Sequence, residues 1–203
     1  RLDRNLVLCR IELDSLDAAL LQIKAMLANK LYVPYTKDIL FVKGTILAHQ
    51  GNVDAAIEAF EQVVGNAADS TASRNDTAQV VGRALYELGL LYQKKKGSYE
   101  KAEKYFRKVT ERGARDSVIF SRAEKRVHAM KTLSEWRAKI ASSDTAIDRQ
   151  KAHYTVGELF YHDLDEPDSA YTQFLRIAVD TVVDSVYTPK SLCMAALIAR
   201  RDL

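Results

Sequence analysis

The sequence predicts an all-α fold: an α–α superhelix, or solenoid, of about ten helices built from repeated helical hairpins. Apolar residues recur every three or four positions through most of the 203 residues, which is the spacing of one face of an α-helix. The chain has only 8 Gly and 3 Pro and no low-complexity tract, so its turns are short and a flexible linker is not expected. One hairpin pattern occurs three times along the chain, and such repetition is typical of a solenoid.

The clearest hairpin spans residues 82–116. Its first helix carries Gly89 and its second carries Ala102, small residues that let two helix backbones approach closely. Gly97 interrupts the pattern between them and predicts the turn. Apolar residues at helical spacing predict the two helices themselves: Leu85, Leu88, Tyr92, Tyr105, Phe106 and Val109.

Two further copies of this hairpin pattern lie on either side of it. The earlier copy consists of Gly44, Leu47, Gly51, Val53, Ala56, Phe60 and Val63. The later copy consists of Val156, Gly157, Phe160, Pro167, Ala170, Phe174 and Ile177. The interval from the helix glycine to the alanine is one residue longer in the central and later copies than in the earlier one. Each unit is too thin to bury its own apolar face, so we expect the copies to stack.

These residues resemble the tetratricopeptide repeat, whose motif is a Trp, Leu-Gly, Tyr, Ala, Phe, Ala and Pro series over about 34 residues. The Trp and the closing Pro of the motif are absent throughout, so the repeats are divergent. A fourth unit at residues 1–36 matches only on its second helix, through Ala19, Ile23 and Met26. The resemblance implies a non-catalytic scaffold that binds a protein or peptide in a concave groove.

We expect one repeat domain over residues 1–203, as a segment of a larger bacterial protein. Its expected units are approximately 1–36, 37–76, 77–116, 117–143 and 144–185, with the opening helix of a further unit at 186–203. The unit at 117–143 has apolar residues at helical spacing and no Gly or Pro, which predicts one helix of about 25 residues. The alternative is a degenerate helical pair that breaks near Lys131, where Thr132 and Glu135 would form a capping box.

Residues that carry catalysis do not form a recognisable constellation in the sequence. No nucleophile with a base, paired carboxylates or glycine-rich phosphate loop is evident. The four histidines are scattered, and no His-Glu-x-x-His spacing occurs. The acidic turn from Asp163 to Asp168 lacks the Gly and distal Glu of a calcium loop, which favours a helix-capping turn. We therefore predict no enzyme activity, no catalytic, metal or cofactor-binding residues, and no cofactor.

The charges are unevenly distributed although the formal net charge is only +3. Basic residues dominate the stretch 94–131, and acidic residues dominate the C-terminal third. A basic stretch of this kind suits an alternative function, the binding of nucleic acid or of an anionic surface. The outer face of a repeat helix is usually charged and solvated without any ligand, so nucleic acid is the less favoured partner.

The family register also predicts which residues face the groove. They lie on the first helix of each hairpin and combine aromatic anchors with polar groups, which suits an extended segment or a helix. Packing within the chain is the alternative role for the aromatic members. The predicted partner-binding residues are Phe41, Thr45, Arg83, Tyr86, Leu90, Gln93, Lys151, Tyr154, Glu158 and Tyr161.

The sequence contains no run of about 20 apolar residues, so it predicts no transmembrane segment. The phrases LDEPDSA and DSVYTPKSL resemble turn sequences in tetratricopeptide-repeat proteins of the bacterial envelope, including lipoproteins that serve outer-membrane assembly. This resemblance favours the bacterial periplasm or the outer-membrane periphery over the cytoplasm. The partner and the oligomeric state do not follow from the sequence.

Overall fold

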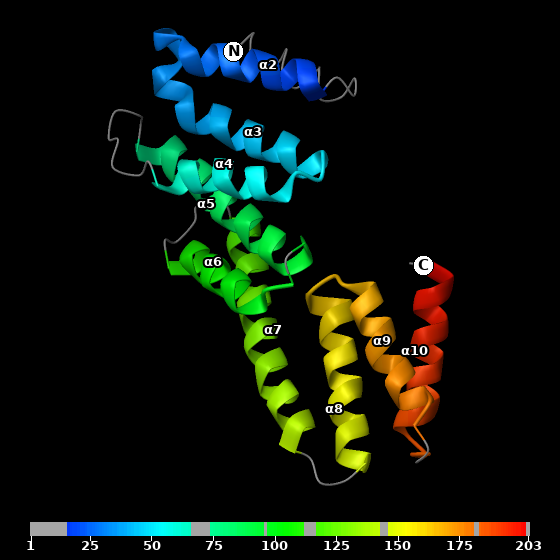
Figure 1. Cartoon of the computed structure of the whole chain (residues 1–203). Helices are drawn as coiled ribbons and strands as arrows, with labels where there is room; N and C mark the ends of the chain where they lie inside the picture. Colours follow the sequence, from blue (N-terminus) through cyan, green and yellow to red (C-terminus); the bar gives the residue numbers. More distant parts are fainter. Residues whose placement is uncertain are drawn as a thin grey trace. The chain divides into compact units, whose positions relative to one another are not determined.

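A computed structural model describes residues 16–65, 74–95, 97–111, 117–142, 146–180 and 183–201, and the regular elements within these ranges are helices (Figure 1). The predicted all-α fold is confirmed. The α-helices are α2 (Leu16–Ala28), α3 (Thr36–His49), α4 (Val53–Gly65), α5 (Arg74–Leu90), α6 (Tyr99–Glu111), α7 (Ser117–Ser142), α8 (Ala146–Glu158), α9 (Pro167–Ala178) and α10 (Tyr187–Arg201). A 3-10 helix, η1, spans Lys30–Tyr35, and π turns form η3 (Leu91–Lys95) and η4 (Leu159–Asp163).

The chain divides into two compact units, residues 1–123 and 124–203. In the first unit α3 packs against α4 and α5 against α6, as antiparallel hairpins, and α4 packs against α5 (Figure 1). Helix α2 packs against α3. Contacts between helices that follow one another along the chain are those of a solenoid, in which each hairpin covers the next. The expectation of one repeat domain stays a prediction.

The second unit contains the hairpin of α8 and α9, with α10 packed against both of its helices. Phe160, Phe174 and Ile177 form its core and are at most 2% exposed. On α10 the side of Ala195 and Ile198 is buried, whereas Leu192 remains 52% exposed. None of the helices in the described ranges has both the length and the apolar character needed to cross a membrane.

In all three hairpins, the two helices pack against each other through the same close contact. A glycine on the first helix lies directly against the ring of a phenylalanine on the second, where a Cβ atom would have no room. A Cβ built on the glycine would lie 2.7 Å from Cε1 of the ring for Gly44 and Phe60, 2.5 Å for Gly89 and Phe106, and 2.7 Å for Gly157 and Phe174. Each phenylalanine is at most 1% exposed. The glycines predicted to be equivalent are therefore equivalent in packing.

The turns of the three hairpins are equivalent as well. Each first helix is followed by a residue with positive φ: 77° at Gly51, 61° at Gly97 and 57° at Asp165. Glycine adopts this conformation without strain, and aspartate tolerates it better than most residues do. The N–H of the next residue then donates to a helix carbonyl at 2.9 Å, from Asn52 to Leu47, from Ser98 to Tyr92 and from Glu166 to Phe160.

A π turn accounts for the extra residue in the central and later copies. Both copies end their first helix with a π turn, η3 and η4, whereas α3 of the earlier copy ends at His49 as an α-helix. A π turn closes i to i+5 and holds one residue more than an α turn. The extra residue is absorbed there, so the contact of the glycine with the phenylalanine and the positive-φ turn are preserved.

Residues 117–142 form one helix of 26 residues, α7. The prediction of a continuous helix is confirmed, and the alternative break near Lys131 is wrong. Ala123, Met130 and Leu133 are buried on its apolar side. Without Gly or Pro, the segment has no residue that removes a backbone hydrogen bond or relaxes the helical dihedrals.

Candidate partner-binding surface

The predicted partner-binding residues occupy matching positions on the first helices of the hairpins. Relative to each helix glycine, the aromatic residues stand three positions before it: Phe41 on α3, Tyr86 on α5 and Tyr154 on α8. In the first unit α3 also packs against α5. Side chains at matching positions on these two helices therefore belong to one surface. The predicted residues of α8 belong to the second unit and are described by themselves.

These three aromatic side chains pack within their own hairpins. Each ring tilts against the phenylalanine that touches the helix glycine, in an arrangement that aromatic pairs favour. The ring centroids are 5.5 Å apart for Phe41 and Phe60, 5.3 Å for Tyr86 and Phe106, and 5.5 Å for Tyr154 and Phe174. Phe41 and Tyr154 remain half-buried, but Tyr86 is only 8% exposed. Tyr86 therefore offers little surface to a partner.

The other predicted residues of the first unit differ in their accessibility. Thr45, Arg83 and Leu90 are half-buried. The hydroxyl of Thr45 donates to the carbonyl of Phe41 at 3.0 Å, a bond within the helix that leaves the hydroxyl oxygen as an acceptor. Arg83 is held by an interaction within the chain. All three side chains are partly accessible, and interactions within the chain hold Thr45 and Arg83.

Gln93 does not lie on this surface. Its placement there assumed an α-helical period through the end of α5, but the π turn η3 occupies Leu91–Lys95. A π turn holds more residues per turn than an α-helix does. Side chains within it therefore do not point to the side of the helix that the α-helical period predicts. Gln93 is 1% exposed, so we remove it from the predicted contact set.

On α8 of the second unit, Lys151 is exposed and Tyr154 and Glu158 are half-buried, and Tyr161 of the π turn η4 that follows is half-buried as well. The ring of Tyr154 also packs against Tyr187 of α10, with centroids 5.6 Å apart. Burial raises the pKa of the Tyr154 phenol, and the charge and hydrogen bond of Glu158 raise it further. A phenol is already protonated at neutral pH, and the raised pKa extends to higher pH the range in which Tyr154 remains a hydrogen-bond donor.

Comparison with known protein families identifies the repeats. Residues 10–73 and 82–112 match two models of the tetratricopeptide repeat family. These two stretches of the chain are tetratricopeptide repeats. Both matches precede the hairpin of α8 and α9, whose equivalence rests on the contact between Gly157 and Phe174. No curated protein matches the chain. Tetratricopeptide repeats generally mediate protein–protein interactions and act as scaffolds, and the family is typically non-catalytic.

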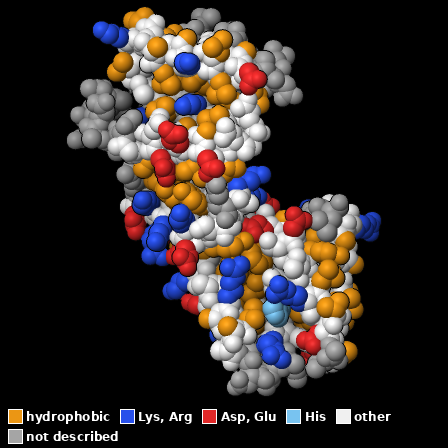
Figure 2. Space-filling view, viewed as in Figure 1, with side chains coloured by type: hydrophobic (Ala, Val, Ile, Leu, Met, Phe, Trp, Pro, Cys, Tyr) orange, Lys and Arg blue, Asp and Glu red, His pale blue; other side chains and the backbone are white. Residues whose placement is uncertain are grey.

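The basic stretch of the repeat protein is only partly a free cationic surface. On α6, four basic side chains are exposed, Lys101, Lys104, Arg107 and Lys108, but the acidic Glu100 and Glu111 are exposed on the same helix. Figure 2 shows basic and acidic side chains side by side over this part of the first unit. Arg107 pairs with Glu103. Lys101 and Lys108 lie over the stacked rings of Tyr92 and Tyr105, whose centroids are 5.3 Å apart.

Two basic residues at the start of the second unit are used within the repeat protein. Lys125 forms an ion pair with Asp163 at 3.0 Å and donates to the carbonyl of His162. Arg126 donates to the carbonyl of Leu164 at 2.9 Å. These cations satisfy carbonyl groups at the C-terminal end of η4, where a positive charge is favoured. The interactions of Lys125 and Arg126 connect α7 to the turn between α8 and α9.

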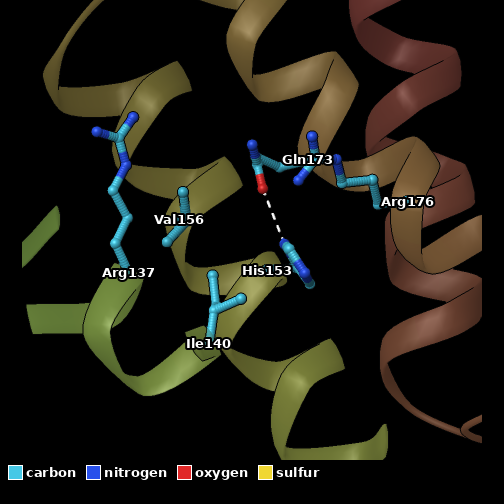
Figure 3. A pocket seen from close by; sticks show the side chains of 6 residues that line it. All are labelled: Arg137, Ile140, His153, Val156, Gln173 and Arg176. Carbon is cyan, nitrogen blue, oxygen red and sulfur yellow. Dashed lines mark hydrogen bonds between the residues drawn. The ribbon is translucent and has the colours of Figure 1, made fainter. Parts of the chain in front are cut away.

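Sequence reasoning missed four polar side chains that the fold brings together in the second unit. Arg137, His153, Gln173 and Arg176 come from α7, α8 and α9 and line one cleft (Figure 3). They are scattered through the sequence without a motif spacing, so only tertiary structure reveals the cluster. Among the described residues, no group of three His, Cys, Asp or Glu side chains is placed to hold a metal ion.

Proposed function

We propose that this protein is a scaffold that holds a peptide segment or a partner protein on the first helices of its hairpins. The observation that carries the proposal is the packing of α3 beside α5, which places Phe41, Thr45 and Leu90 on neighbouring helix faces while each stays half-buried. Side chains that are already held in place lose little conformational entropy when a partner binds. Apolar anchors with polar neighbours are the composition of such contact surfaces.

The test compares two double variants that change charge and polarity equally. Arg83→Glu with Leu90→Lys alters the proposed surface, and Lys104→Glu with Val118→Lys alters exposed residues of the same unit that the proposal leaves out. Tyr86→Ala is unsuitable because it would remove the packing against Phe106, and a large-to-small core change costs about 3–5 kcal/mol. All three proteins are checked for equal helicity by circular dichroism.

Each protein is then used for affinity capture from cells that contain it naturally. The native chain and the control variant should retain the same partner. The variant at Arg83 and Leu90 should bind this partner at least about ten-fold more weakly. The reason is that a reversed charge and a lysine buried under the partner each cost about 1 kcal/mol or more of binding free energy. Equal retention by all three proteins would show that the partner binds elsewhere. Failure of the native chain to retain any partner would count against a scaffold.

A second candidate function is favoured by the exposed cations of α6 beside the stacked Tyr92 and Tyr105. It is the binding of nucleic acid or an anionic surface by the stretch 94–131. Duplex DNA and vesicles of anionic lipid, each titrated at rising salt, test its two forms, because phosphate binding weakens steeply with salt. Lys104→Glu with Lys108→Glu should abolish either interaction, and no binding at low salt would remove this candidate.

A further inference from the structure

The 3-10 helix η1 holds several apolar side chains in water. Leu31 is 80% exposed, Val33 and Tyr35 are each 59% exposed, and Pro34 is exposed as well. η1 turns the chain from α2 into α3 at one edge of the first unit (Figure 1). A single exposed apolar residue is ordinary, but several adjacent ones on a short segment mark an interaction site.

The period of the 3-10 helix explains which side chains of η1 face outward. Three residues complete a turn, so Leu31 eclipses Pro34 and Lys30 eclipses Val33. The third side carries Tyr32, which is half-buried and packs against the apolar core shared by α2 and α3. Because Tyr32 holds one side of η1 against this core, the other two sides point into water.

Hydrogen bonds hold both ends of η1 in this conformation. The side chain of Asn29 accepts a bond from the N–H of Leu31, and the carbonyl of Asn29 accepts one from the N–H of Tyr32, each at 3.0 Å. At the other end, the carbonyl of Val33 accepts bonds from the backbone N–H and, at 2.8 Å, from the hydroxyl of Thr36. Backbone groups that are bonded within the chain lower the cost of entering an apolar medium.

The charge of this part of the chain is positive. The stretch 18–37 contains Lys24, Lys30 and Lys37 and no Asp or Glu. Lys24 and Lys30 are exposed, and neither forms an ion pair with another described residue. Lysines near the surface of a membrane attract it when its lipids are anionic. The apolar side chains of η1 therefore belong to a basic segment.

A protein and a lipid bilayer both accept apolar side chains, and two features of η1 favour the bilayer. Leu31 protrudes, and a protruding side chain enters a soft interface without needing a matching pocket. The bonds at both ends of η1 also occupy backbone groups that a protein partner would use for directed hydrogen bonds. Tyrosine, which ends η1, is enriched at the level of lipid headgroups.

We propose that η1 inserts into the surface of a bilayer that contains anionic lipids. Leu31, Val33 and Pro34 enter the boundary of the acyl chains, and Tyr35 lies among the headgroups. Lys30 extends its ammonium group to a lipid phosphate while its aliphatic stem stays beside Val33. This surface lies outside the predicted partner-binding residues of α3 and α5, so the inference goes beyond the scaffold function. So short an anchor supports reversible binding.

The probes are vesicles of phosphatidylcholine alone and of phosphatidylcholine mixed with phosphatidylglycerol. The full chain is mixed with each kind of vesicle and floated through a density gradient. The native chain should bind the mixed vesicles at least about ten-fold more tightly than the neutral ones, because each lysine near an anionic surface strengthens binding about five-fold. Salt should weaken this difference, because it screens the charges.

Leu31→Ser with Val33→Ser should weaken binding to the mixed vesicles about ten-fold or more, because it removes two of the inserted apolar side chains. The matched control is Leu192→Ser with Val183→Ser, which changes the same residue types in the second unit, where they are 52% and 76% exposed. The control should bind within about two-fold of the native chain. Circular dichroism checks that all three proteins have equal helicity.

The depth of insertion is measured with Val33→Trp and phospholipids that carry bromine on their acyl chains. Bromine should quench the added tryptophan, whereas Val183→Trp should show only the signal of the native Trp136, the single tryptophan of the chain. The Lys104→Glu with Lys108→Glu variant should bind within about two-fold of the native chain, because α6 is not part of the contact.

Four results would overturn the proposal: no flotation of the native chain, equal binding by the native chain and the serine variant at Leu31 and Val33, no quenching at position 33, or loss of binding in the α6 variant. A self-associated native chain that the same serine substitutions dissociate, and that does not float with vesicles, would assign η1 to a second copy of the chain and overturn it as well.

Discussion

Gly89→Ala tests the packing of the central hairpin with a single methyl group. The new Cβ would lie 2.5 Å from Cε1 of Phe106, about 0.9 Å closer than the 3.4 Å at which ordinary contacts begin. Phe106 is fully buried and its ring is also packed against Tyr86, so it has little freedom to retreat. Overpacking of a core costs about 1–3 kcal/mol, and the better helix propensity of alanine returns about 1 kcal/mol. The two terms leave a net loss of up to about 2 kcal/mol, and because the ring of Phe106 has little room to retreat we expect the upper end of that range.

The assay is thermal and urea unfolding followed by circular dichroism, with Gly65→Ala as the matched control. Gly65 ends α4, and a Cβ there meets nothing within 4 Å, so alanine should be neutral or slightly stabilising. A loss of about 2 kcal/mol lowers the melting temperature by about 4–8 °C in a chain of this size. In a double-mutant cycle, Phe106→Leu should relieve part of the cost of Gly89→Ala. Equal stability of the Gly89→Ala and Gly65→Ala chains would contradict the predicted clash with Phe106.

Two further predictions concern stability. Gly97→Ala should lower the free energy of unfolding by about 1 kcal/mol, because φ is 61° at this position and a residue with a Cβ is strained in that region. Gly97→Asn should lower it less, because Asn tolerates a positive φ. Equal urea midpoints for both variants and the native chain would contradict this prediction. Burial raises the pKa of Glu87 above its ordinary 4.5, with His49 lowering it in part, so the ionised form present at pH 7 is disfavoured by folding. Glu87→Gln should therefore raise the urea midpoint at pH 7. The gain should fade as the pH falls through the raised pKa of the folded state towards 4.5, and it should be absent well below 4.5, where the glutamate is neutral in the folded and unfolded states. A less stable Gln variant at pH 7 would mean that the attraction to His49 outweighs burial.

The hairpins could be predicted because their determinants are local. The helix glycine, the turn glycine, the alanine and the phenylalanine recur in one order, and the contact of Gly89 with Phe106 follows from that order. The longer interval in two copies was also visible in the sequence, but its location in a π turn was not. A single added residue can be absorbed in a turn or in a helix, and tertiary packing decides which. The burial of Gln93 depends on this π turn and does not follow from the sequence period.

Features that depend on distant pairs could not be predicted. The use of Lys125 and Arg126 on the carbonyls of His162 and Leu164 joins residues 37 and 38 positions apart, and nothing in the basic stretch indicated it. The cleft of Arg137 and Arg176 likewise needs three helices in place before its side chains meet. Periodicity identifies the face of a helix, but it does not identify the neighbour that the face meets.

The central claim is that three stretches of this chain are copies of one hairpin, each fastened by a glycine against a phenylalanine ring. A NOESY spectrum of a deuterated chain with protonated glycine and phenylalanine measures this contact directly. The account predicts strong cross-peaks from the Hα protons of Gly44, Gly89 and Gly157 to the rings of Phe60, Phe106 and Phe174, respectively, and none from Gly65 to any of these rings. Absence of the cross-peak at any of the three glycines, or its replacement by a cross-peak to a different phenylalanine ring, would contradict the claim.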